Sequence, residues 1–133
     1  MLTAASPRIQ TTARGPVELF TDGDGPNVLA LHGAMGGWDQ SLLLAHTLAP
    51  GFRALAISRP GYLGTPLLSG AAPEQQADLC AALLDALGLE RVIVMAVSGG
   101  GVMALPFAAK YPARVEKLVL VSTFAGKDRK SVV

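Results

Sequence analysis

Four short apolar runs alternate with longer helical stretches along this chain of 133 residues. The runs are Asn27–Leu31, Arg53–Ile57, Arg91–Val97 and Val115–Val121. Each is almost continuously apolar, as a parallel strand must be when helices cover both faces of its sheet. The alternation predicts an α/β fold with an open, mostly parallel sheet and helices on both faces. The length predicts one domain, residues 1–133.

The remaining elements are marked by turn residues and helix-end signals. Two weaker strands, Arg8–Thr12 and Val17–Thr21, precede a turn rich in Asp and Gly and predict an antiparallel hairpin at the sheet edge. Helices are predicted over Trp38–Leu48, Pro73–Leu87 and Gly99–Lys110. Cys80 lies on the apolar stripe of the second helix and reads as a core residue, and Pro106 predicts a kink in the third.

The composition excludes several classes of protein. One cysteine and two histidines leave no internal disulfide and no Cys/His zinc site, so we expect neither a metal nor a cofactor. The net charge of +1 has no basic cluster apart from Lys127–Lys130, which we interpret as a solvated tail, so no nucleic-acid partner is expected. Residues 1–16 lack an apolar core and no run is long enough to span a membrane. We therefore expect a cytoplasmic protein without a membrane partner.

The segment that carries most chemical information is the predicted turn at Ser98. An apolar strand runs through Ala96 and Ser98 into glycines and then directly into a helix. Such a tight turn strains the serine backbone and requires small residues two positions before and after it, as Ala96 and Gly100 are. The helix amino terminus presents free N–H groups, so the N–H of Gly99 is placed to stabilise an oxyanion.

Two further loops follow predicted strands and should meet Ser98. His32-Gly33-Ala34 follows the first apolar run, and its glycines allow close backbone approach, which makes the N–H of Ala34 the natural second oxyanion donor. The loop 58–65 follows the next strand. Because ligands bind at the carboxyl ends of parallel strands, we expect the three loops to line one crevice. The glycine run after Ser98 could instead suggest a phosphate-binding turn, but neither G-x-G-x-x-G nor a Walker lysine is present.

Taken in order, these marks resemble the amino-terminal half of the α/β-hydrolase family. They are the strand before His32-Gly33, the loop Arg59-Pro60-Gly61-Tyr62-Leu63-Gly64, the turn at Ser98, and Tyr111-Pro112-Ala113-Arg114-Val115. The resemblance covers about Gly15 to Ser122 and implies about six of the eight strands of the family fold. It implies Ser98 as nucleophile, with Gly99 and Ala34 as oxyanion donors. Ala96 stands where the family usually has Gly, and Ser58 where Asp is frequent.

The family triad runs Ser, acid, His, but no histidine follows Ser98 in this sequence. Asp128 is a weak candidate for the acid. We expect His32 to shape the oxyanion loop and not to act as a base, and we expect His46 to be exposed or packed. Trp38 and Tyr62 could line a substrate pocket, but we interpret them as packing beside the loops. Arg59 is interpreted as either a loop anchor or a carboxylate binder.

Two function classes follow from these residues. The first is an esterase-like serine hydrolase acting on an ester or other acyl substrate, catalytically incomplete in this chain because it lacks the triad His. The second is a non-catalytic binding or interaction protein with a truncated hydrolase fold. These residues do not distinguish esterase activity from cofactor-free peroxidase-type chemistry on the same fold.

The resemblance also bears on the partners of the chain. The strand Val115–Val121 should present an unpaired edge, and part of the apolar sheet face should lack its covering helix. We therefore expect self-association or a complementary carboxyl-terminal segment, with a small acyl substrate once the site is complemented.

Overall fold

The computed structural model describes residues 6–34, 36–122 and 129–132. Its strands form one sheet in the order β1-β2-β4-β3-β5-β6-β7. The strands are β1 Arg8–Gln10, β2 Val17–Asp22, β3 Asn27–Leu31, β4 Arg53–Ile57, β5 Val92–Val97, β6 Val115–Ser122 and β7 Arg129–Val132. The pairs from β4 through β3 and β5 to β6 are parallel, whereas β1, β2 and β7 pair antiparallel at the two sides. The predicted α/β class and the edge hairpin are confirmed.

The helices begin and end close to the predicted positions. They are α1 Trp38–Leu48, α2 Pro73–Leu87 and α3 Gly101–Lys110, with 3-10 turns at Leu67–Ser69, Ser98–Gly100 and Pro112–Arg114. The third helix starts two residues later than predicted because the turn at Ser98 is 3-10. It continues beyond Pro106 to Lys110.

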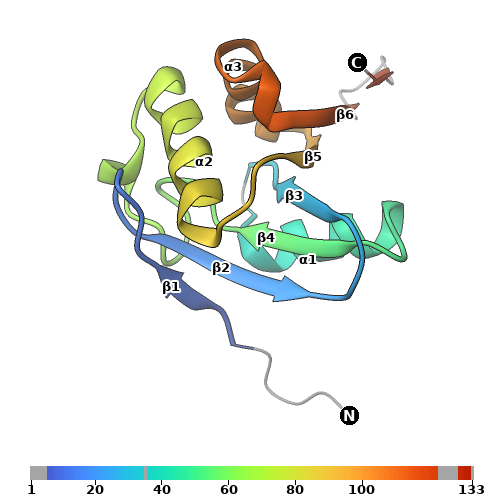
Figure 1. Cartoon of the computed structure of the whole chain (residues 1–133), viewed down its shortest axis with the longest axis horizontal. Coiled ribbons are helices and arrows are strands. Elements are labelled where there is room, and N and C mark those ends of the chain that lie inside the picture. The colour runs from blue at the N-terminus through green and yellow to red at the C-terminus, as the bar shows by residue number, and fades with distance from the viewer. Residues whose placement is uncertain (1–5, 35, 123–128, 133) are drawn as a thin grey trace.

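Helices cover the sheet from both sides (Figure 1). On one side α2 and α3 lie side by side and bury the larger core, which includes Leu29, Leu31, Leu83, Val94 and Phe107. On the other side α1 packs on β3 and β4. The continuous apolar character of β3 and β5 follows from this two-sided burial.

The predicted unpaired edge at β6 is wrong. β7 pairs antiparallel with the carboxyl-terminal part of β6, from Val119 opposite Val132 to Ser122 opposite Arg129. Arg129 and Lys130 therefore lie in a strand and not in an irregular tail, while Lys127 and Asp128 fall outside the described residues. Strand pairing uses backbone groups, and edge strands tolerate charged residues, so a charge run does not exclude a strand.

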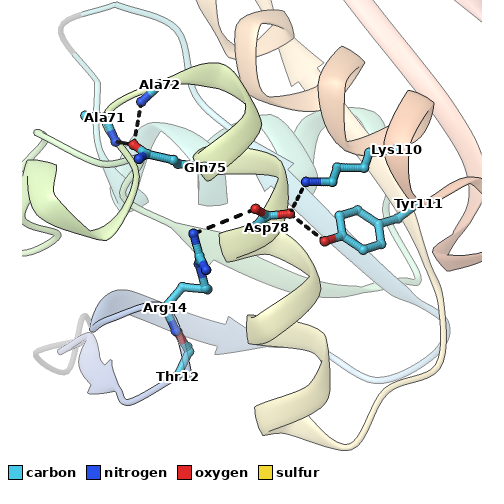
Figure 2. Close-up of polar contacts among 8 residues, drawn as sticks. All are labelled: Thr12, Arg14, Ala71, Ala72, Gln75, Asp78, Lys110 and Tyr111. Atoms are coloured by element: carbon cyan, nitrogen blue, oxygen red, sulfur yellow. Dashed lines mark hydrogen bonds and ion pairs between the residues drawn. The ribbon is translucent and has the colours of Figure 1, made fainter.

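A polar cluster around Asp78 ties the two covering helices to the β1–β2 connection (Figure 2). The Asp78 carboxylate accepts a hydrogen bond from the Tyr111 hydroxyl at 2.5 Å and pairs with Lys110 Nζ at 2.8 Å. Arg14 Nη2 lies 3.7 Å from its other oxygen. The cluster thus joins α2, the end of α3 and the loop before β2.

Candidate active site

Ser98 occupies a strained turn between β5 and α3. Its φ of 48° lies in the left-handed region, which costs a non-glycine residue roughly 1 kcal/mol or more. A Cβ added at Gly100 would collide with the carbonyl oxygen of Leu31 and lie 2.9 Å from that of His32. Ala96, two residues before Ser98, is buried. The predicted strain at Ser98 and the need for a small residue at position 100 are confirmed.

The loop after β3 lies directly beside this turn. A Cβ added at Gly33 would be 3.4 Å from Ser98 Cβ, and one added at Gly99 would be 3.5 Å from the amide nitrogen of Ala34. The structure therefore brings together the three residues predicted for the site: Ser98, Gly99 and Ala34.

A cavity of about 450 Å³ opens in front of Ser98. Its walls come from the β3–α1 loop, one face of α1 and the end of β5: Gly33, Ala34, Gln40, Leu43, Leu44, Thr47, Val97 and Ser98. The volume is in the range of small-molecule sites. The lining is mostly apolar, with Gln40, Thr47 and Ser98 as its polar side chains.

His32 is fully buried and uses both ring nitrogens. Nδ1 donates to the carbonyl oxygen of Gly33 at 2.7 Å, and Nε2 accepts the backbone N–H of Arg59 at 2.9 Å. Burial lowers the pKa of His32, and the Arg59 guanidinium lowers it further, which favours the neutral ring. His32 therefore links two loops and has no free nitrogen to take a proton from Ser98, as expected for a structural residue.

Arg59 is buried and anchors its loop. Its Nε donates to the carbonyl oxygen of His32 at 2.8 Å, and its guanidinium lies 5.0 Å from the centre of the Tyr62 ring. Tyr62 packs edge-on against His32, and Trp38 packs against Phe20. These contacts support the interpretation that Arg59 anchors its loop and that Tyr62 and Trp38 are packing residues.

Sequence reasoning missed Glu18, which reaches this loop from β2. Glu18 Oε1 accepts the hydroxyl of Ser58 at 2.8 Å and the N–H of Gly64 at 2.9 Å. Ser58 Oγ in turn accepts the N–H of Trp38, the first residue of α1, at 3.0 Å. The contact is invisible in the sequence because 40 residues separate Glu18 from Ser58.

Gln40 was also missed. It lies in the first turn of α1, and its Oε1 accepts the N–H of Gly33 at 2.7 Å. Gln40 lies between Asp39 and Ser41 at the polar start of α1, so no sequence signal distinguishes it from its neighbours.

The other predicted residues lie away from Ser98 or outside the described chain. His46 is half-exposed in the last turn of α1, with Nε2 3.0 Å from Asp22 Oδ2. Cys80 is buried, and burial raises the pKa of its thiol. Asp128 lies outside the described residues. Over residues 6–34, 36–122 and 129–132, no cluster of three or more His, Cys, Asp or Glu could hold a metal ion. Within the same ranges no helix is long and apolar enough to cross a membrane.

Comparisons with known proteins agree with this fold. The family described as alpha/beta hydrolase fold matches residues 26–132. A solved alpha/beta hydrolase fold protein from Nakamurella multipartita superposes with a TM-score of 0.84 at 45% identity, covering 93% of this chain and 45% of that one. An esterase from Thermogutta terrifontis gives a TM-score of 0.72 at 28% identity, covering 90% of this chain and 46% of that one.

Among curated proteins, an uncharacterized hydrolase of Bacillus subtilis is 32% identical over 108 residues. A 2-hydroxy-6-oxo-6-phenylhexa-2,4-dienoate hydrolase of Comamonas testosteroni is also 32% identical over 108 residues. The matches cover 81% and 74% of this chain, but only 38% and 37% of the relatives. The chain thus spans less than half the length of these proteins.

Proposed function

Because the chain belongs to the alpha/beta hydrolase fold family, we propose that Ser98 is the nucleophile of a hydrolase acting on ester or other acyl substrates. The observation that carries the proposal is the left-handed backbone of Ser98 beside the cavity, with the backbones of Ala34 and Gly99 next to it. The N–H groups of these two residues are the proposed oxyanion donors. A cytoplasmic location stays a prediction from the composition.

In the proposed reaction, Ser98 Oγ attacks the carbonyl carbon of the acyl substrate and its proton passes to a base. The carbonyl oxygen becomes the oxyanion. The bond to the leaving alcohol then breaks, and the alcohol takes the proton from the base. Water attacks the acyl-serine by the reverse sequence, which releases the acid and restores the Ser98 hydroxyl.

The described residues provide no base for Ser98. His32 has both nitrogens engaged, His46 lies in the last turn of α1, and no histidine follows Ser98 in the sequence. We propose that a complementary carboxyl-terminal segment supplies the base. The greater length of the matched relatives supports this.

Exogenous imidazole tests the role of Ser98 in the chain as it is. The full chain is treated with a fluorophosphonate, and Ser98 modification is followed by mass spectrometry at increasing imidazole concentration. Ser98 Oγ should attack phosphorus, fluoride should leave, and imidazole should take the proton. We expect Ser98 to be labelled preferentially over the other serines, at a rate that rises with imidazole.

Ser122 serves as an internal reference, since it lies at the end of the neighbouring strand β6 and not in a left-handed turn. Ser98→Ala should abolish the imidazole-dependent signal while leaving background labelling unchanged. If a folded sample shows no imidazole-dependent labelling of Ser98, or equal labelling of Ser122, the hydrolase proposal falls. The non-catalytic interaction protein is then the better reading.

A further inference from the structure

The β3–α1 loop is wrapped around the carboxamide of Gln40. Oε1 of Gln40 accepts the N–H of Gly33 at 2.7 Å. A Cβ added at Gly36 would lie 2.7 Å from the same oxygen and 2.8 Å from Gln40 Cδ. The loop therefore contacts this one side chain both before and after Ala34. The Gly33 N–H needs an acceptor, which fixes the orientation of the Gln40 amide.

Two hydrogen bonds hold the two peptide groups of Gly33. In the His32–Gly33 peptide, the N–H of Gly33 donates to Gln40 Oε1. In the Gly33–Ala34 peptide, the carbonyl oxygen of Gly33 accepts a hydrogen bond from His32 Nδ1 at 2.7 Å. In a planar trans peptide the N–H points opposite to the carbonyl. The direction of the Ala34 N–H is therefore set by His32 at one peptide and by Gln40 at the one before it.

The need for such an anchor follows from the composition of the loop. Glycines at positions 33, 36 and 37 give the backbone wide conformational freedom, and neither a helix nor a strand restrains residues 32–34. An oxyanion donor acts only when it already points at the developing charge. Gln40 lies in α1, which packs on the sheet. Its hydrogen bond to Gly33 therefore restrains the loop relative to the helix.

We propose that Gln40 is a positioning residue that orients the Ala34 N–H toward the acyl oxygen at Ser98. This inference rests on the proposed function. The neutral amide suits the role because a carboxylate at position 40 would accept the same N–H but place a negative charge beside the oxyanion.

Amide exchange and labelling kinetics test the two parts of this inference in the full chain. Gln40→Met removes the acceptor at nearly constant size and should speed exchange of the Gly33 amide by roughly 3- to 10-fold, measured by NMR. It should also lower the maximal rate of imidazole-dependent Ser98 labelling by about 10-fold or more. The probe concentration at half-maximal rate should change much less than the maximal rate, because Met keeps nearly the volume of the Gln40 side chain that lines the cavity. Gln40→Glu should keep the Gly33 amide protected but still label slowly.

Gln75 provides a matched control. Its Oε1 accepts the N–H groups of Ala71 and Ala72 at 3.0 Å each, before α2 (Figure 2). Gln75→Met should lower stability without changing Gly33 exchange or the maximal labelling rate. Wild-type Gly33 exchange in Gln40→Met would overturn the anchor. Faster exchange with an unchanged maximal rate would overturn its role at Ser98. Absence of labelling in the wild-type chain would instead overturn the proposed function, and with it the catalytic meaning of the anchor.

Discussion

At the scale of single residues, Ser58 and Glu18 together link the start of α1 to the loop after β4, a link that one carboxylate side chain at position 58 could make alone. Ser58 stands where Asp is frequent in the family to which the chain belongs. Here the carboxylate comes from Glu18 on β2, and the Ser58 hydroxyl connects it to the N–H of Trp38. The start of α1 and the loop after β4 are thereby tied to one carboxylate.

This division predicts non-additive substitutions at the two positions. Ser58→Ala should cost about 1–2 kcal/mol of unfolding free energy, because it leaves the partly buried Trp38 N–H without its acceptor. Ser58→Asp should also destabilise, because it sets two carboxylates side by side, and adding Glu18→Gln should recover most of the loss. Urea unfolding followed by Trp38, the only tryptophan, measures wild type, the single variants Ser58→Ala, Ser58→Asp and Glu18→Gln, and the double variant. Equal stability of Ser58→Asp and wild type would contradict the shared role.

What the sequence could predict at this scale depended on local geometry. Ser98, Ala96 and Gly100 belong to one turn whose strain is set by neighbouring residues, and the structure has that turn. Glu18 contacts Ser58 only because β2 pairs with β4, and Gln40 contacts Gly33 only because the loop folds back on α1. No periodicity or motif in the sequence predicts either contact.

At the scale of elements, the Asp78 cluster predicts a pH-dependent link between α2 and α3. The hydrogen bonds from Lys110 and Tyr111 are the main causes that lower the pKa of Asp78. A carboxyl whose folded-state pKa lies below its unfolded value stabilises the fold above the unfolded pKa, and this contribution disappears as the pH falls through the folded-state pKa. Asp78→Asn should therefore cost about 1 kcal/mol at neutral pH, since the carboxylate is partly exposed.

The difference between wild type and Asp78→Asn isolates this contribution from other acid-sensitive groups such as His32. Their unfolding free energies should differ at neutral pH and converge as the pH falls through the lowered folded-state pKa of Asp78. Asp85→Asn is a suitable control, since Asp85 also pairs with an arginine, Arg114, but is far more exposed, at 71%. A gap for Asp78→Asn that stays constant over this range would argue against the ionic link.

Hydropathy and helix-end residues predict some of the helices and strands but not all of them. The bounds of α1 and α2 agree with prediction because Pro and Gly mark their ends. β7 was missed because two of its four residues are charged, whereas strand pairing with β6 uses backbone groups. The same pairing removed the expected free edge of β6, although not its uncovered face.

At the scale of the whole molecule, one face of the sheet is covered only in part. α1 packs on β3 and β4, while residues of β5 and β6 that point to the same side stay partly exposed, among them Ile93, Val97, Val119 and Val121. Ile93 and Val119 pack at the margin of a small cluster of Val28, Ala49 and Met95. Apolar faces of this kind are rarely left in contact with water. We propose that self-association or a complementary carboxyl-terminal segment covers this face.

Val119→Lys tests the proposed cover, because it places a charge on this face, opposite Met95 of β5. The wild-type chain should sediment with a coefficient that rises through the micromolar range, and Val119→Lys should reduce that rise. Leu68→Lys is the control, since Leu68 is 96% exposed on the turn before α2. A wild-type monomer that binds a hydrophobic dye, with dye binding lost in Val119→Lys, would favour the complementary segment. A dye-free monomer that unfolds cooperatively would overturn both partners, because the face would then be stable in water without a cover.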